Sequence, residues 1–314
     1  LDHVILVKLA STAVIASLFE LSKGETINAL SQVFVDGHSL RTYRHSPNAG
    51  PRKSWAAGDA TSRALQLVML TMKGQIGYPS AITAPTWGFK DVLFNGNDFK
   101  IKQEFKSYVM ENILFKISFP AEFHAQTAVE AAVALHPEVV NKLEKIEKIL
   151  ISTHESAIRI ISKEGDLNNP ADRDHCIQYM TAIGLLKGDL IAEDYEDDTA
   201  ADPRIDSLRE KMIIEENKRY SKEYLEADKR SIANSIQIFF NDGSTTEKIE
   251  VEYPIGHRRR RKEGIPILLS KFENNLKSHF DENKVNEILN VCLNFDKLDH
   301  ISVVEFMTLF SSKN

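Results

Sequence analysis

Cysteine is scarce in this sequence, since Cys176 and Cys292 are the only two among 314 residues. They stand far apart in apolar helical surroundings, so they offer no disulfide framework and suit a reducing compartment. We therefore predict buried thiols and a cytoplasmic protein. Two distant thiols also cannot hold an iron–sulfur cluster. Any chemistry normally carried by such a cluster would fall to side chains alone, and we predict no cofactor and no metal.

Long apolar runs and familiar nucleotide or hydrolase motifs are also missing. Residues 4–21 are the most apolar stretch, but Lys8, Ser11 and Glu20 make it a core helix instead of a membrane span. The net charge of −6 argues against a nucleic-acid or anionic membrane partner. The sequence has no Walker loop, G-x-G-x-x-G, H-E-x-x-H or G-x-S-x-G. Nucleotide-binding, zinc-protease and esterase functions therefore have no support.

The chain opens on Leu1, without the basic start of a secretory signal, and enters an apolar helix almost at once. We therefore expect it to begin inside a longer parent protein. With 314 residues, of which 42% are hydrophobic, it has enough material for two cores. Two domains are the first expectation.

Helical periodicity dominates the first part of the chain. We predict helices over residues 3–21, 25–36 and 55–73, each ended by a glycine in a left-handed cap, and a short helix over 87–94. The capping glycines would be Gly24, Gly37 and Gly74. The small residues at the start of the third helix let other backbones approach closely. That helix is therefore predicted to be central.

After Pro120, helical and β-patterned segments alternate. We predict helices over 121–135, 171–186 and 203–214, and strands over 149–153, 235–240 and 248–253. Residues 241–244, Asn-Asp-Gly-Ser, form a hairpin turn signal between the last two strands. From Pro266 onward the pattern is helical again, and we expect this tail to join the first domain. The fold class is mainly α with an α+β part and a small antiparallel sheet.

A basic loop before the third helix is the first candidate site. It ends where backbone N–H groups at a helix start add positive potential. A tricarboxylate needs several such groups, because one opposite charge near 4 Å contributes only ~4 kcal/mol at an effective dielectric of about 20. The alternative is a solvated charged loop. The basic residues of this segment are Arg41, Arg44, His45, Arg52 and Lys53.

Two further clusters contain groups suited to proton transfer. Lys116 and His124 flank Pro120 among apolar neighbours, where partial burial can prepare a lysine for acid–base work. A helix over 171–186 would place Asp172, His175 and Tyr179 on one face. The structural alternatives are a surface lysine, a packed histidine and a helix cap. The basic run at 257–262 lacks interleaved aromatic residues, so we interpret it as a domain junction or surface turn.

These clusters resemble the MmgE/PrpD family, also called the 2-methylcitrate dehydratase family, which includes cis-aconitate decarboxylase. The resemblance covers essentially the whole chain and is closest to the bacterial 2-methylcitrate dehydratase branch. The segments that carry it are 1–4, 36–45, 50–64, 108–112, 115–132, 168–180 and 252–257.

The resemblance implies a helical domain made from both ends of the chain, residues 1–111 and 256–314, with an inserted α+β lid of residues 112–255. The implied site lies between these domains and uses His3, Lys53, Lys116 and Tyr179 for catalysis. Its substrate-binding residues would be Arg41, Arg44, Arg52 and, more weakly, His124. Family enzymes carry a further N-terminal helical segment, so we expect this chain to be the C-terminal two-thirds of such an enzyme.

The implied activity is metal-independent removal of water from 2-methylcitrate, giving 2-methylaconitate, in propionate breakdown. A citrate or aconitate substrate differs by one methyl group, worth only ~1–3 kcal/mol of discrimination, so side activity is expected. The alternatives are decarboxylation of cis-aconitate, citrate dehydration or aconitate hydration, and an inactive fragment of such an enzyme. Family members are typically homodimers. The implied partners are thus a small tricarboxylate and a second copy.

Overall fold

The computed structural model describes residues 1–44, 48–100 and 108–311, which form two compact units. The first unit contains residues 1–106 together with the short segment 166–173. The second contains residues 107–165 and 174–314. His45, part of the predicted basic loop, lies outside the described residues.

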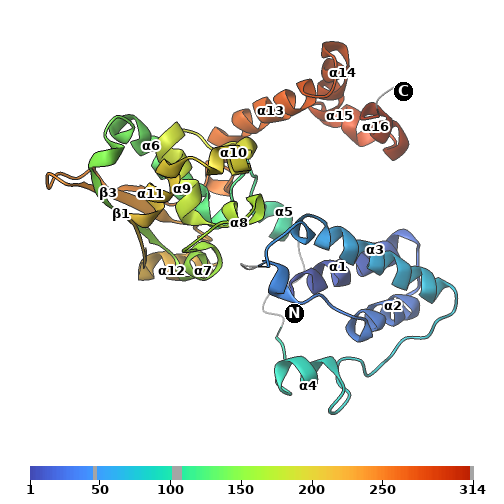
Figure 1. Ribbon diagram of the computed structural model, residues 1–314. Helices are drawn as coiled ribbons and strands as arrows, with labels where there is room; N and C mark the ends of the chain where they lie inside the picture. The colour runs from blue at the N-terminus through green and yellow to red at the C-terminus, as the bar shows by residue number, and fades with distance from the viewer. Residues whose placement is uncertain (45–47, 101–107, 312–314) are drawn as a thin grey trace. The chain divides into compact units, whose positions relative to one another are not determined.

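Among the described residues, the regular elements of the first unit are helices joined by loops (Figure 1). Its elements are α1 (Val4–Leu18), α2 (Lys23–Val35), the 3-10 turn η1 (Arg41–Arg44), α3 (Arg52–Met72), α4 (Phe89–Phe94) and, from the later segment, α8 (Pro170–Arg173).

Helix α3 packs against both α1 and α2, which also pack against each other, so its predicted central position stays a prediction. Ala56, Ala60 and Ala64 on α3 are buried, and the first two pack with Val4 of α1. A second cluster joins the other ends of the helices through Ala16, Ala29 and Val68. Side chains as short as alanine allow the helix backbones to approach closely, as the sequence indicated.

The predicted glycine caps are confirmed at one of three positions. Gly74 has a φ of 87°, as expected after α3. Gly24 instead lies inside α2, which begins with a capping box between Ser22 and Glu25, and the left-handed residue after α1 is Glu20 with a φ of 56°. The Ser22 hydroxyl accepts from the Glu25 N–H and the Glu25 carboxylate accepts from the Ser22 N–H, and this capping box sets the start of α2.

The second unit contains a sheet covered by helices. Its elements up to residue 225 are α5 (Tyr108–Asn112), η2 (Phe123–Ala125), α6 (Gln126–Val139), η3 (Leu143–Lys145), β1 (Ile146–Thr153), α7 (Glu155–Ile161), α9 (Ile177–Lys187), η4 (Ala192–Tyr195), α10 (Asp197–Ala200), α11 (Pro203–Glu210), β2 (Met212–Glu216) and α12 (Lys218–Leu225). The remaining elements are β3 (Asn234–Phe240), β4 (Ile249–Val251), η5 (Arg258–Arg260), α13 (Arg261–Lys277), α14 (Glu282–Cys292), α15 (Phe295–His300) and α16 (Val303–Leu309).

The four strands lie in the order β2-β1-β3-β4. The predicted hairpin is confirmed, because β3 and β4 pair antiparallel and Gly243 in the turn has a φ of 83°. The prediction of an antiparallel sheet is wrong in one respect: β2 pairs parallel to β1, so the sheet is mixed. The helix predicted over 203–214 ends at Glu210, and its last residues belong to β2.

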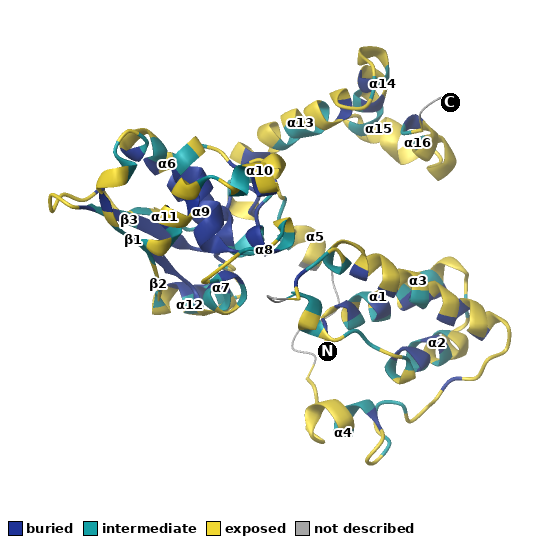
Figure 2. Cartoon of the chain, in the orientation of Figure 1, coloured by how far each residue is buried: buried dark blue, intermediate teal, exposed yellow. Residues whose placement is uncertain are grey.

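Helices α6 and α9 form the buried layer of this unit (Figure 2). Every residue of α9 from Ile177 to Leu185 is buried. Gly184 permits the close approach, since a Cβ there would lie 2.9 Å from Cβ of Ala132 on α6. The central strands β1 and β3 complete the core with Ile149, Ile151 and Ile236.

The single helix predicted over 171–186 does not form. Helix α8 ends at Arg173, and the backbone at Cys176 is extended (φ −125°, ψ 108°) before α9 begins. Asp172, His175 and Tyr179 therefore do not share one helix face. Cys176 is fully buried, as predicted, and burial raises its pKa. Cys292 is only partly buried, so the prediction of two buried thiols is wrong for Cys292.

Helices α13, α14 and α16 share a cluster of their own around Leu276, Val285, Ile288 and Leu309. Contacts assign this tail to the second unit. The predicted joining of residues 256–314 to residues 1–111 stays a prediction.

Candidate active site

The start of the first unit brings three predicted residues together. His3 precedes α1, and its Nδ1 accepts a hydrogen bond of 3.2 Å from Nη1 of Arg41. Desolvation lowers the pKa of His3 below its ordinary value, and the charges of Arg44 and Arg41 add to this effect. The ring is therefore neutral at pH 7, with its proton on Nε2.

Arg44 already has a carboxylate partner within the protein. Its Nε donates to Oδ2 of Asp2 over 2.6 Å, and Asp2 is 1% exposed. Burial alone would raise the pKa of Asp2, but Arg44 and the Val4 N–H outweigh it and lower the pKa. A buried carboxylate needs this neutralisation. The structure thus gives Arg44 a role in folding, and its predicted contact with substrate stays a prediction.

Arg52 is similarly engaged at the first turn of α3. Its Nη2 lies 3.1 Å from both Oγ of Ser39 and Oδ2 of Asp59, and its guanidinium stacks 4.3 Å above the Trp55 ring. The neighbouring Lys53 donates from Nζ to the carbonyl of Ala171 over 3.2 Å. Lys53 therefore ties α3 to the segment of residues 166–173 within the same unit.

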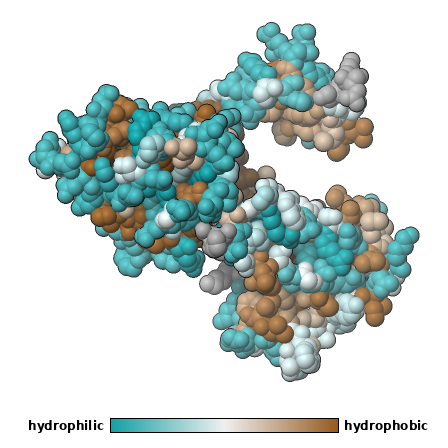
Figure 3. All heavy atoms as spheres, viewed as in Figure 1, coloured by the Kyte–Doolittle hydropathy of each residue, from teal (hydrophilic) through white to brown (hydrophobic). Residues whose placement is uncertain are grey.

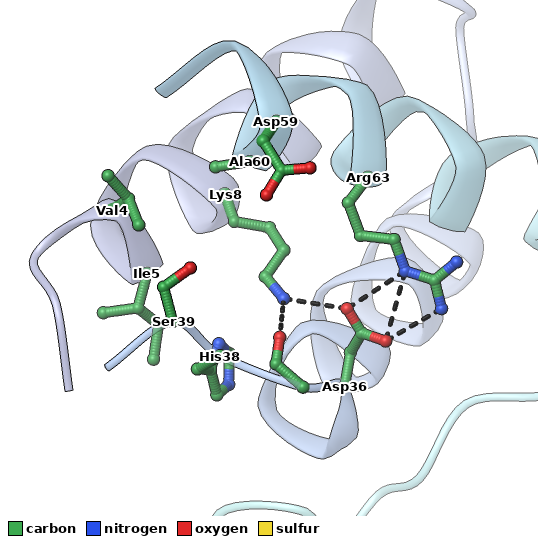
Figure 4. Close-up of a pocket in the computed structure, with 10 residues that line it drawn as sticks. Val4, Ile5, Lys8, Asp36, His38, Ser39, Asp59, Ala60 and Arg63 are labelled. Carbon is green, nitrogen blue, oxygen red and sulfur yellow. Dashed lines mark hydrogen bonds and ion pairs between the residues drawn. The ribbon is translucent and has the colours of Figure 1, made fainter. Parts of the chain in front are cut away.

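A cavity of about 300 Å³ in the first unit lies beside an ion-pair network (Figure 4). Lys8, 4% exposed, donates to Oδ2 of Asp36 over 2.8 Å and to the Gly37 carbonyl over 2.7 Å. Arg63 reaches the same carboxylate, and the two cations lower the pKa of Asp36 to about 2 despite burial.

His38 lines this cavity with both ring nitrogens buried and no hydrogen-bond partner among the described residues. Burial, with Lys8 adding to it, lowers its pKa. None of the residues predicted from the sequence as catalytic or substrate-binding lines this cavity. The network joins α1, the end of α2 and α3, so we interpret it as structural.

In the second unit, His124 is held at both ring nitrogens. Nδ1 lies 2.7 Å from Oε1 of Glu122, and Nε2 lies 3.1 Å from the Tyr224 hydroxyl. Burial alone would raise the pKa of Glu122, but His124 holds it below the ordinary value. The Tyr224 ring stacks on His154 with centroids 4.5 Å apart. Burial lowers the pKa of His154 to about 4, so His154 is neutral at pH 7.

A cavity of about 460 Å³ opens beside this array. Its polar lining comes from Asn112, His124, Tyr224, Arg230 and His257, and its apolar lining from Val109, Ile113, Leu114, Phe123 and Ile232. Arg230 is exposed and has a φ of 47°, which is unusual for a residue with a side chain. A cation at the edge of a partly apolar cavity suits a carboxylate that carries a hydrocarbon group.

The remaining two candidates of the second unit have different surroundings. Lys116 is exposed, and its Nζ lies 5.1 Å from the centre of the Phe123 ring. Desolvation lowers the pKa of Lys271, and the nearby charge of Lys116 adds to that shift. Tyr179 is 2% exposed and donates from its hydroxyl to the Asp194 carbonyl over 2.6 Å. Its predicted part in catalysis stays a prediction.

Sequence reasoning missed Glu122, His154, Tyr224 and Arg230. Glu122 stands two residues before His124, and that spacing next to a proline was the one available signal. Tyr224 and His154 are distant from His124 in the sequence, so only the fold brings them together. Within residues 1–44, 48–100 and 108–311, no group of three or more His, Cys, Asp or Glu side chains is arranged to hold a metal ion.

Comparison with known families identifies both parts of the chain. The MmgE/PrpD N-terminal domain matches residues 1–102, and the MmgE/PrpD C-terminal domain matches residues 119–296. The chain belongs to the MmgE/PrpD family. No helix in the described part of this family member is long and apolar enough to cross a membrane.

Several curated proteins resemble this MmgE/PrpD chain over nearly all its length. It is 55% identical to the 2-methylcitrate dehydratase of Escherichia coli K12, over 99% of this chain and 65% of that protein. It is 57% identical to the mitochondrial 2-methylcitrate dehydratase of Yarrowia lipolytica, over 100% of this chain and 61% of the relative. A 2-methylcitrate dehydratase-like protein of Aspergillus oryzae is 42% identical over 99% of this chain. The chain thus spans less than two thirds of the length of the first two relatives.

Proposed function

We propose that this chain belongs to an enzyme that removes water from 2-methylcitrate to give 2-methylaconitate, using side chains alone. The observation that carries the proposal is the identity of 55% and 57% to two proteins named 2-methylcitrate dehydratase, each over at least 99% of this chain. The two well-separated cysteines, one of them fully buried, support chemistry without an iron–sulfur cluster.

The reaction needs one base and one acid. A proton leaves the carbon next to a carboxylate, a double bond forms as the C–O bond breaks, and the hydroxyl departs with a proton as water. A positioned acid or base improves each proton transfer about 10²- to 10⁴-fold. His3, Lys116 and Tyr179 are the predicted acid–base groups, and Lys53 is predicted to stabilise the developing negative charge.

Carboxylate binding falls to the remaining predicted residues. Arg41 donates to a neutral histidine and keeps its charge, whereas Arg44 and Arg52 are already paired with Asp2 and Asp59. Arg41 is therefore the arginine of the first unit best suited to bind a substrate carboxylate. His124 lines the cavity of the second unit and is the predicted binding residue there.

The activity is tested with the protein encoded by the gene of this chain. Incubation with 2-methylcitrate should increase the ultraviolet absorbance of the new double bond, and a chelator should leave the rate unchanged. Citrate should react more slowly, because it lacks one methyl group. Carbon dioxide release from cis-aconitate would instead indicate a decarboxylase. Loss of activity with chelator and its rescue by iron would contradict the metal-free proposal.

Cytoplasmic placement is part of the same proposal and rests on the cysteine usage. The Yarrowia lipolytica relative is named as mitochondrial. Cell fractionation followed by detection of the protein distinguishes the two compartments.

A further inference from the structure

His124 has a fixed orientation, because different segments hold its two ring nitrogens. Glu122, immediately before η2, lies within 2.8 Å of Nδ1 through both carboxylate oxygens. Tyr224, on α12, places its hydroxyl 3.1 Å from Nε2. A histidine held by a carboxylate on one side commonly has its tautomer set by that contact.

The protonation states of the neighbours decide which tautomer this is. The Glu122 carboxylate, whose pKa lies below its ordinary value, can only accept a hydrogen bond, so the Nδ1 that contacts both of its oxygens carries a proton. Burial raises the pKa of Tyr224, so its hydroxyl stays protonated and donates to Nε2. The titratable and charged groups that surround His124 and its cavity include Glu122, His154, Arg159, His175, Tyr224, Arg230 and His257.

Packing holds Tyr224 in position independently of that hydrogen bond. Its ring lies against His154 with an interplanar angle of 10°. His154 is itself fixed, because it is fully buried and its Nδ1 caps α7 by accepting from the Ala157 N–H. The Tyr224 side chain and His124 both line the cavity of about 460 Å³, whose edge carries Arg230.

We propose that Glu122 is a positioning residue that keeps His124 in its Nδ1–H form, and that Tyr224 is a catalytic residue that relays a proton between substrate and Nε2 of His124. This inference rests on the proposed dehydratase function. The substrate class is a carboxylate whose charge meets Arg230 and whose hydrocarbon part meets the apolar lining.

In the proposed relay, each proton that moves has a donor and an acceptor. As the C–H bond breaks, the Tyr224 oxygen receives the proton from carbon and gives its own proton to Nε2 of His124. The electron pair of the C–H bond becomes the double bond, and the hydroxyl leaves as water with a proton from a separate acid. Tyr224 ends neutral, and His124 ends as an imidazolium whose charge Glu122 stabilises.

Removal of the Tyr224 hydroxyl tests the proposed proton relay. Tyr224→Phe keeps the ring that stacks on His154, so kcat should fall about 10²-fold or more while KM and thermal stability change little. Tyr220→Phe is the matched control: it lies one turn earlier on α12 and loses a hydroxyl bonded to Glu250 over 2.6 Å, away from the cavity. Its kcat should stay within about threefold of the wild type. Equal kcat values for Tyr224→Phe and the wild type would overturn the relay.

The tautomer is tested without reference to activity. Ring-nitrogen NMR of histidine-labelled protein should show His124 as Nδ1–H in the wild type. Glu122→Gln should shift this signal toward Nε2–H, because the amide can donate to Nδ1, and Glu122→Asp should restore part of the Nδ1–H signal. An unchanged signal in Glu122→Gln would overturn the positioning role. Wild-type protein that leaves 2-methylcitrate unchanged would overturn the proposed function and the relay, while the NMR result still decides the tautomer.

Discussion

Individual cations in this chain differ in what they already bind. Arg44 neutralises the buried Asp2, whereas Lys53 and Lys116 contact a backbone carbonyl and an aromatic ring. Losing the partner of a buried carboxylate is costly, while losing a carbonyl or ring contact costs little. Substitution of Lys53 or Lys116 should therefore reduce activity with little loss of stability, whereas substitution of Arg44 should reduce both.

Removing Lys53 or Lys116 should reduce turnover far more than stability. We expect Lys53→Ala and Lys116→Ala to lower kcat about 10²- to 10⁴-fold, with thermal midpoints within about 2 °C of the wild type. Lys142→Ala is a matched control, because Lys142 lies 4.2 Å from the Phe240 ring in a comparable contact. Steady-state kinetics and thermal unfolding check this prediction. Parallel losses of activity and stability would indicate structural roles.

Asp36 should contribute pH-dependent stability to the first unit. Its folded-state pKa of about 2 is below the ordinary value of 3.8, so the contribution is complete above about pH 4 and is lost as pH falls through about 2. Because solvent reaches the Arg63 side of the pair, we expect Asp36→Asn to cost about 1–2 kcal/mol at pH 7. Urea unfolding at pH 7, 5 and 3.5 measures the difference between the two proteins.

If the free energies of unfolding of the wild type and Asp36→Asn differ by the same amount over that whole pH range, the lowered pKa of Asp36 is contradicted. Asp59→Asn provides the comparison, since Asp59 lines the same cavity but is 54% exposed in its pair with Arg52. Its substitution should change stability by less than about 0.5 kcal/mol.

At the scale of elements, the ends of helices depend on left-handed residues and on what surrounds them. Gly188 ends α9 with a φ of 69°, and a Cβ there would lie 2.7 Å from the His136 ring. Gly165 has a similar φ of 77° but open space around it. Gly165→Ala should cost about 1 kcal/mol from backbone strain, and Gly188→Ala about 2–4 kcal/mol because strain and overlap add. Chemical unfolding compares them, and equal costs would show that His136 moves aside.

The arginines of η5, just before α13, also have structural partners. Arg258 and Arg259 donate to the Asp228 carbonyl, and Arg260 pairs with Glu130 and Glu263. Arg260→Met should therefore destabilise the second unit by about 1–3 kcal/mol, because it leaves the partly buried Glu130 unpaired. A salt-dependent DNA gel shift should be absent from the wild type and from Arg258→Ala. A shift that this substitution abolishes would support a nucleic-acid site instead.

Sequence patterns predicted those features of the fold that depend on a few neighbouring residues. The buried alanines of α3, the cap at Gly74 and the β3–β4 turn each follow from a few adjacent residues. The parallel pairing of β2 could not be predicted, because it brings residues 212–216 beside β1, and contacts between distant segments leave no periodic pattern. The break at Cys176 was missed for the opposite reason: residues 171–186 have a helical composition, and tertiary contacts override it.

Some residues of the candidate site could likewise be predicted from local sequence, and others could not. His124 and Lys116 were identified because they flank a proline that precedes a helix. Tyr224 and Arg230, about a hundred residues after His124, reach the cavity that His124 lines only through the fold. Their types and spacing alone mark no site, since an isolated tyrosine or arginine on a polar segment is ordinary surface.

At the scale of the whole molecule, apolar side chains remain exposed on the helices of the first unit, and Figure 3 shows hydrophobic surface there. Those on α1 and α3 are Leu6, Val14, Leu18, Trp55, Leu65, Met69, Leu70 and Met72. Surfaces of this kind are uncommon on isolated monomers. We therefore predict a dimer or larger species by light scattering. A monomer that binds no apolar dye would contradict this prediction.

The discontinuity of the first unit has a consequence for protein synthesis. Residues 166–173 belong to that unit, and Lys53 and Ala49 bond to Ala171 and Asn169 within it. Domains commonly fold as units from the N-terminus while the ribosome is still extending the chain. Here the first 106 residues emerge without their final segment, so the first unit stays incomplete until β1 and α7 have also been made. Nascent chains arrested before residue 166 should therefore leave α1–α3 sensitive to protease, and longer arrested chains should protect them.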